Sequence, residues 1–144
     1  MSESMWDRPS YFEYNGFPTK VIRSTADAEP TVWRFSPDTG GWRRDDDIIV
    51  ELESNSRADV IELVRDDFIE LTEWSRAHYV RGDGPVFALY ETLHAVGEQA
   101  ERESRPLTVN ERALIRGLSR KTYVMFERDL AAKGAPGADP APEA

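Results

Sequence analysis

The spacing of apolar residues changes near residue 55, and this change limits the fold more than any other feature. Before it, apolar runs are short and are separated by turn residues such as Asn15-Gly16 and Ser36-Pro37-Asp38-Thr39-Gly40-Gly41. After it, apolar residues recur every three or four positions over long stretches. Short runs between turns are typical of antiparallel strands, and the longer spacing is typical of amphipathic helices. We therefore expect an α+β domain: an antiparallel meander of about four strands, followed by three α-helices packed on one sheet face.

The first strands are predicted from turn chemistry. Tyr11–Tyr14 runs into Asn15-Gly16, a pair suited to a two-residue hairpin turn, and Thr19–Arg23 is the return strand. Pro18 has no N–H to donate to a neighbouring strand, so it favours a sheet edge. Thr31–Phe35 forms the third run of the sheet.

The last part of the predicted sheet follows the turn at residues 36–41. Trp42 opens the next strand, and the clearest alternation lies in Ile48–Glu53. There Ile48, Val50 and Leu52 would point to one face while two glutamates point to the other, although Ile49 interrupts the pattern. The sheet is therefore expected to span residues 11–53.

Three helices are predicted over residues 56–79, 85–104 and 108–133. Ser56 and Asp59 resemble a capping box at the start of the first helix, whose apolar stripe runs through Val60, Val64, Phe68, Leu71 and Trp74. Pro85 suits the first turn of the second helix. Thr108 and Glu111 form a capping box for the third, which is expected to bury Leu114, Leu118, Met125 and Leu130 and to end at Lys133-Gly134.

The chain is predicted to hold a single domain over residues 11–133. Residues 1–10 are a lead-in. Residues 135–144 contain three Pro, one Gly and no large apolar side chain. Such a composition buries too little apolar surface to fold, so a disordered tail is expected there.

Charge and cysteine content exclude several classes of protein. The 144 residues include 27 acidic and 18 basic side chains, which gives a formal net charge of −9. Nucleic acids and anionic membranes attract positive surfaces, so neither is an expected partner. There is no Cys, which removes disulfides and thiolate chemistry. With no signal peptide or membrane-spanning run in this sequence, we expect a soluble, cytoplasmic protein.

No group of residues suggests a catalytic, cofactor or metal site. Glu91 and His94 have the spacing of one di-iron ligand motif, but such sites need that motif twice. Asp45-Asp46-Asp47 lacks the loop spacing of a calcium site, and alternate side chains on an extended chain diverge. There is no phosphate-binding glycine loop and no nucleophile elbow. An enzyme is therefore not the favoured class.

Two features suggest surfaces that bind other molecules. Arg112, Arg116 and Arg120 recur every four residues on the third predicted helix, forming a line of cations about 12 Å long. This line could dock an acidic partner or pair with Asp66, Asp67, Glu70 and Glu73 inside the chain. The sheet region also carries more aromatic rings than one buried face needs, namely Tyr11, Phe12, Tyr14, Phe17, Trp33, Phe35 and Trp42.

The leading hypothesis is a non-catalytic, acidic protein-interaction module of the inhibitor, immunity or adaptor type. Its partner would be another protein, with a basic protein favoured because an acidic surface steers basic partners into contact. The expected partner-binding residues are Trp33, Trp42, Asp45, Asp46, Asp47, Arg112, Arg116 and Arg120. A homodimer interface would explain the same observations. The alternative is a small-ligand-binding or enzymatic domain with a pocket between sheet and helices, lined by Trp74, His78, Tyr90 and His94.

Overall fold

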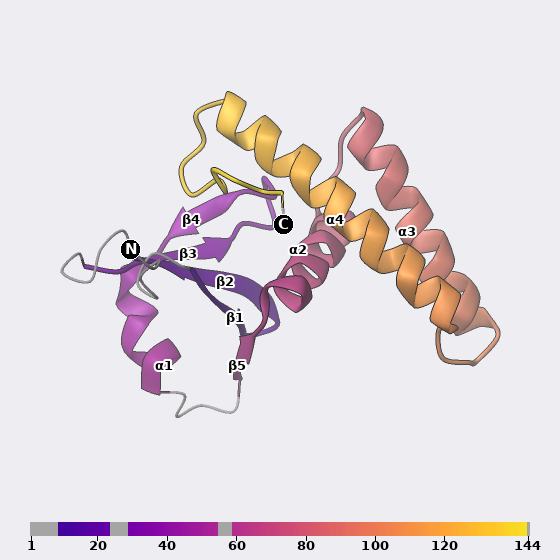
Figure 1. The fold of residues 1–144 in the computed structure, drawn as a ribbon, viewed down its shortest axis with the longest axis horizontal. Helices are drawn as coiled ribbons and strands as arrows, with labels where there is room; N and C mark the ends of the chain where they lie inside the picture. The colour runs from indigo at the N-terminus through magenta and orange to yellow at the C-terminus, as the bar shows by residue number, and fades with distance from the viewer. Residues whose placement is uncertain (1–8, 24–28, 55–58, 144) are drawn as a thin grey trace, which may run out of the picture.

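The protein contains one five-stranded antiparallel sheet with helices on both sides (Figure 1). The computed structural model describes residues 9–23, 29–54 and 59–143. The strand order is β4-β3-β2-β1-β5. The strands are β1 Ser10–Tyr14, β2 Phe17–Ile22, β3 Thr31–Phe35, β4 Trp42–Arg44 and β5 Val60–Leu63. The predicted α+β class is confirmed, with five strands rather than about four.

The first hairpin follows the prediction. Asn15 and Gly16 have φ angles of 51° and 85°, the positive values that a tight two-residue turn requires, and Tyr14 pairs with Phe17 across it. Pro18, however, lies in a central strand. It is paired with Glu13 of β1, while the pairs between β2 and β3 begin only at Thr19. The missing N–H of Pro18 therefore removes no hydrogen bond from the sheet, so Pro18 does not need to lie in an edge strand.

The described residues contain the three long helices predicted, together with one short α-helix between β4 and β5 that was not predicted. The helices are α1 Ile49–Ser54, α2 Arg65–Tyr79, α3 Pro85–Arg102 and α4 Val109–Ala132. Pro85 occupies the first turn of α3, and Thr108 and Glu111 form the predicted capping box of α4. Gly134, with a φ of 72°, ends α4 as expected.

The strand predicted at Ile48–Glu53 is wrong. Asp46–Ile48 forms a 3-10 helix that leads into α1. Ile48 and Leu52 are four residues apart and share the buried side of this helical turn, whereas Val50 is 71% exposed. The break in alternation at Ile49 was the signal for this, since Ile48, Ile49 and Leu52 share one face only in a helix.

The helix predicted over residues 56–79 also differs from the structure. Ser56 lies outside the described residues, and Val60–Leu63 is an edge strand that pairs with β1. The helix begins at Arg65, directly after Val64. The run from Val60 to Val64 is rich in β-branched side chains, which suit a strand, but the pairing partner lies about fifty residues earlier in the chain.

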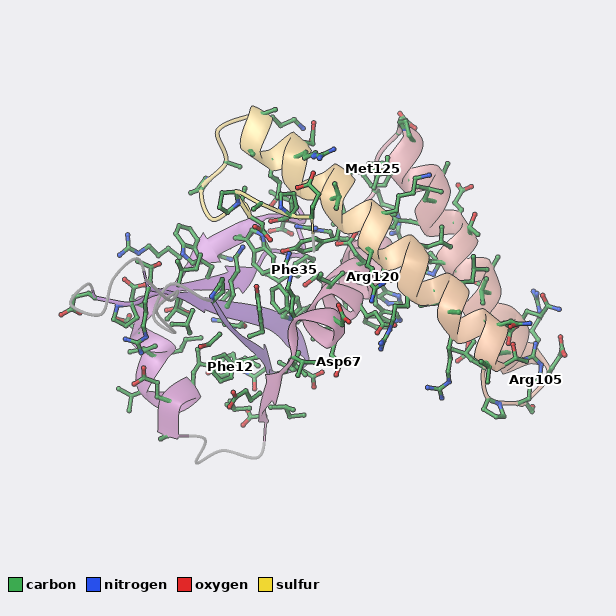
Figure 2. The ribbon with its side chains drawn as sticks, in the orientation of Figure 1. Phe12, Phe35, Asp67, Arg105, Arg120 and Met125 are labelled. Carbon is green, nitrogen blue, oxygen red and sulfur yellow. The ribbon has the colours of Figure 1, made fainter. Side chains whose placement is uncertain are left out.

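Each face of the sheet has its own core, so helices do not cover one face only. On one face, Phe12, Tyr14 and Val32 pack with Ile48 and Leu52 of the α1 region. On the other, the cluster contains rings from the sheet and side chains of α2, α3 and α4: Tyr11, Phe35, Trp42, Phe68, Ile69, Tyr90, Tyr123, Phe126 and Leu130. Figure 2 shows Phe12 on the side of α1 and Phe35 on the side of α2. The aromatic surplus noted in the sequence therefore fills two cores.

The two ends of the helical layer lie far apart. α3 and α4 form an antiparallel pair that extends away from the sheet, and Arg105 lies at its far tip (Figure 2). There Arg105 pairs with Glu103 and Glu111 at 3.0 and 2.7 Å.

At the other end of α4, residues 135–143 fold back from the helix and lie beside β3 and β4 (Figure 1). The structure thus gives these residues defined contacts where the sequence predicted a disordered tail.

The position of α1 can be tested with two neighbouring substitutions. Leu52 is 1% exposed in the core beneath α1, so Leu52→Ala should lower the free energy of unfolding by about 2–5 kcal/mol. Val50→Ala, at an exposed position of the same helix, should change it by less than about 0.5 kcal/mol. Urea unfolding measures both. Equal losses would instead fit a strand with both side chains buried, and would contradict the helix.

Candidate functional site

The two tryptophans predicted to bind a partner do not form an exposed patch on the sheet. Trp42 is 5% exposed, and its indole N–H donates to the Glu127 carboxylate at 3.2 Å. Trp33 is half-buried, and its indole N–H donates to Thr31 at 3.0 Å. Gly137 lies against the Trp33 ring and the Cβ of Trp42, since an added Cβ there would come within 2.6 Å of a Trp33 ring atom and 2.9 Å of the Trp42 Cβ. The C-terminal residues therefore cover the Trp33 indole, and the Trp42 indole is buried in the core.

The Asp45–Asp47 run stabilises the corner between β4 and α1. The Asp45 carboxylate pairs with Arg34 at 3.0 Å. Asp46 accepts the Val32 backbone N–H at 2.9 Å and a hydrogen bond from Arg44 at 2.9 Å. The hydrogen bond from Arg44 lowers the pKa of the Asp46 carboxyl. Asp47 is exposed. Two of the three carboxylates thus have partners within the fold.

The arginine line on α4 faces the acidic side of α2. Arg116 lies 2.9 Å from Glu70 and 3.6 Å from Asp67, and Arg120 lies 3.2 Å from Asp66. These are solvent-exposed pairs, which stabilise the fold only weakly. Arg112 is also exposed, and it lines a shallow groove between α2 and α4. Two of the three predicted arginines therefore pair within the chain.

The most unusual site is one that the sequence did not indicate, a buried cluster of charges between the sheet and the helices. We call Lys20, Glu73, Arg76 and Glu127 the polar cluster. The last three side chains are fully buried and Lys20 is 3% exposed. Arg76 donates to Glu73 at 2.8 Å and to the Gly40 carbonyl at 2.8 Å, and it also donates to Glu127. One side chain of α2 therefore joins the β3–β4 turn to α4.

Tyr90 and Lys20 complete the surroundings of the two carboxylates. The Tyr90 hydroxyl donates to Glu73 at 2.7 Å. The Lys20 ammonium lies 3.9 Å from Glu127 and 4.4 Å from the centre of the Trp42 ring. Isolated charges would not tolerate this burial, so the cluster is stable only as a complete set.

Burial and opposite charges compete in this cluster. Burial raises the pKa of the Glu73 carboxyl, although Arg76 opposes the shift. Burial alone would lower the pKa of Arg76, but Glu73 and Glu127 raise it, so the guanidinium stays charged. Burial lowers the pKa of the Lys20 ammonium to about 8, because Glu127 and Asp139 offset only part of the desolvation. Lys20 therefore changes its protonation state in the mildly alkaline range.

A second ring of polar side chains surrounds the cluster and includes the C-terminal residues. Asp139 accepts hydrogen bonds from the Tyr123 hydroxyl at 3.0 Å and from Arg65 at 3.2 Å. Its backbone N–H donates to Glu127 at 2.8 Å. Arg65 also donates to the Tyr11 hydroxyl at 2.7 Å. With these residues in place the cluster is closed to solvent, and its role is to hold the sheet, the helices and the C-terminal residues together.

The outer surface of α2 carries a row of exposed aromatic side chains. Trp74 is 56% exposed and Tyr79 is 44% exposed. Trp74 stacks on His78 with ring centres 4.9 Å apart and planes 6° apart, and His78 contacts Tyr79 edge-on at 4.9 Å. We call Trp74, His78 and Tyr79 the aromatic row. It belongs to neither core.

A groove of about 490 Å³ adjoins this row between α2 and α3. It is lined by Ala77, Val80, Arg81, Gly82, Phe87, Tyr90, Glu91, His94, Ala95 and Glu98. His94 connects it to the row, since its ring lies 6.2 Å from His78 and its Nε2 donates to the Ala77 carbonyl at 2.6 Å. The four side chains expected to line a ligand pocket, Trp74, His78, Tyr90 and His94, thus lie in or beside a surface groove between two helices.

Metal and membrane sites were also sought in the part of the chain that the structure describes. Within residues 9–23, 29–54 and 59–143, no three His, Asp or Glu side chains come together as a metal ion would require. No helix in these ranges is both long and apolar enough to cross a membrane.

The lowered pKa of Lys20 makes stability depend on pH. The unfolded chain holds this proton up to its ordinary pKa of about 10.5, whereas the folded chain releases it above about 8. The unfolded state therefore binds more protons in this window, and the free energy of unfolding should rise by on the order of 1 kcal/mol between about pH 8 and pH 9.5. As pH falls through 8, this gain in the free energy of unfolding is lost.

Chemical unfolding at several pH values measures the effect. Lys20→Met should remove the rise, because no proton is then exchanged at this position. Lys121→Met, at an exposed position of α4, should keep it. A rise of the same size in Lys20→Met would show that another group causes it.

The chain was compared with known proteins in three ways. No family model matches it, and neither a curated protein nor a solved structure resembles it. Its fold and candidate sites are therefore interpreted from its own residues and geometry.

Proposed function

We propose that this protein is a non-catalytic interaction module that binds another protein through the aromatic row and the adjoining groove between α2 and α3. The observation that carries the proposal is the exposed, ordered stack of Trp74 on His78. A stacked indole loses little conformational freedom on binding, and exposed Trp and Tyr are the side chains that most often dominate protein interfaces.

The charges beside the groove favour a partner segment that is both apolar and basic. Its floor includes Phe87 and Ala77, while Glu91 and Glu98 are exposed carboxylates at its edge. A net charge of −9 would speed the approach of a basic partner over a longer range. We therefore expect binding to weaken as salt concentration rises.

The polar atoms of the groove argue against the ligand-binding or enzymatic alternative. The Tyr90 hydroxyl is bonded to buried Glu73, and the Nε2 of His94 is bonded to the Ala77 carbonyl. Both groups form hydrogen bonds within the fold, whereas a catalytic site would direct them at a substrate. The proposal thus keeps the class of function expected from the sequence and moves the surface from the sheet to α2 and α3.

The test is a comparison of proteins captured by tagged full-length variants from the native lysate. Wild type should retain a stoichiometric partner that elutes as salt is raised, and Trp74→Ala and Glu91→Lys should each reduce its recovery at least about tenfold. Leu114→Ala is the matched control, because Leu114 is 46% exposed on α4. It should capture as wild type does.

Two results would contradict the proposal. One is recovery of the same partner by Trp74→Ala and wild type, and the other is capture of nothing by wild type. Capture of only a second copy of this chain would assign the surface to a homodimer.

A further inference from the structure

The residues that follow α4 pack against the sheet and against α4. We call residues 135–143 the C-terminal segment. The turn at Gly134 reverses the chain, and the Ala135 N–H donates to the Leu130 carbonyl at 2.9 Å. The segment then runs beside β3 and β4 (Figure 1). It lies against the Trp33 ring and the Cβ of Trp42, where Gly137 fits because it has no Cβ.

One acidic side chain of this segment reaches the buried charges. The Asp139 carboxylate accepts from Tyr123 and Arg65, and a turn within the segment directs the Ala141 N–H to its second oxygen at 2.9 Å. Burial alone would raise the pKa of Asp139, but these hydrogen bonds and the nearby cations Arg65 and Lys20 lower it. The environment is therefore that of a carboxylate-binding site.

Charge balance shows why an anion is needed there. Lys20, Arg65 and Arg76 are cations, whereas Glu73 and Glu127 are the carboxylates of the neighbouring chain elements. Without Asp139, one positive charge would be in excess beside the buried cluster. A surplus cation attracts an anion, so the surface exposed by departure of the segment would favour an incoming carboxylate.

The segment itself is held by small side chains. Its residues are Ala, Pro, Gly, Asp and Glu: Ala135 and Ala138 pack against the core and Pro142 is buried, but no large side chain anchors the segment. At its end, Glu143 pairs with Arg128 through two exposed side chains, which stabilises little. Segments with few buried apolar contacts open at lower cost than the core.

We propose that the C-terminal segment is a displaceable internal ligand, and that the surface beneath it binds an acidic, extended peptide of a partner protein whose carboxylate replaces Asp139. The chain's own segment shows the chemistry that fits: small and proline-rich residues around one carboxylate, with a backbone N–H directed at Glu127. This site is separate from the aromatic row, so the two proposals stand or fall independently.

The test uses full-length protein and a fluorescent peptide with the sequence of residues 134–143. Asp139→Asn should weaken the internal contact, so this variant should bind the peptide at least about tenfold more tightly than wild type does. The same peptide with Asn in place of its Asp should not bind. Arg128→Ala removes only the exposed pair with Glu143 and should bind within about twofold of wild type. Equal binding of both peptides, or binding of neither to any variant, would overturn the proposal.

Hydrogen exchange on wild type decides the matter even if Asp139→Asn does not fold. The Asp139 amide is bonded to Glu127, and it should exchange at least about tenfold faster than the amide of Phe126 in α4. Equal rates would mean that the segment leaves only when the whole protein unfolds, and would contradict displacement.

A dimer would also overturn the proposal of a foreign ligand. If wild type forms dimers as its concentration rises, and these dissociate when the peptide is added, the site beneath the segment binds a second copy of this chain.

Discussion

The guanidinium group of Arg76 lies where the sheet, the helices and the C-terminal segment meet. It donates hydrogen bonds to the β3–β4 turn at Gly40, to Glu73 one helical turn away and to Glu127 on α4. Its charge also lies 4.1 Å from the centre of the Phe126 ring. A planar donor with several N–H groups can satisfy all these acceptors at once, whereas Lys could not. The packing of three chain segments thus depends on the burial of one cation and its carboxylates.

The hydrogen bonds around Arg76 and Glu127 hold several parts of the molecule together. Glu127 accepts from Trp42, Arg76 and the Asp139 backbone, so α4, β4 and the C-terminal segment are joined through one carboxylate. The α3–α4 pair extends away from this centre, and the aromatic row lies on the outer side of α2. The buried charges thus hold α2 in place but lie away from its exposed aromatic row. They also lie beneath the C-terminal segment, whose Asp139 N–H donates to Glu127.

Local signals in the sequence predicted much of the fold. The Asn15-Gly16 turn, the Thr108–Glu111 capping box and the first turn at Pro85 are confirmed because each depends on residues close in sequence. Val60–Leu63 was predicted as helix because its strand character appears only once it pairs with distant β1. In Ile48–Leu52 the prediction gave more weight to Ile48, Val50 and Leu52, which alternate as in a strand, than to Ile49, which shares a face with Ile48 and Leu52 only in a helix. Local sequence patterns do not show which segments pair when they are far apart in the chain.

The candidate site was missed for a related reason. Hydrophobic periodicity assumes that charged residues face water, so Glu73 was grouped with the exposed acidic residues of the helix, Trp74 was placed in its apolar stripe, and Arg76 was not singled out. In the structure these positions are reversed. The spacing of Glu73 and Arg76 was a usable signal, but ion pairs at this spacing are usually exposed. The small residues of the C-terminal segment gave no sign of packing, because their contacts depend on Gly137 and Asp139.

A double-mutant cycle between Arg76 and Glu127 tests most directly whether the buried charges act as a unit. Free energies of unfolding would be measured for Arg76→Met, Glu127→Gln and the double variant. Each single change leaves a partner charge buried and should cost about 3–5 kcal/mol. The double variant should lose less than the sum of the two, with a coupling of on the order of 2 kcal/mol. Strictly additive losses would contradict the account, since they would mean that the two side chains stabilise the fold separately.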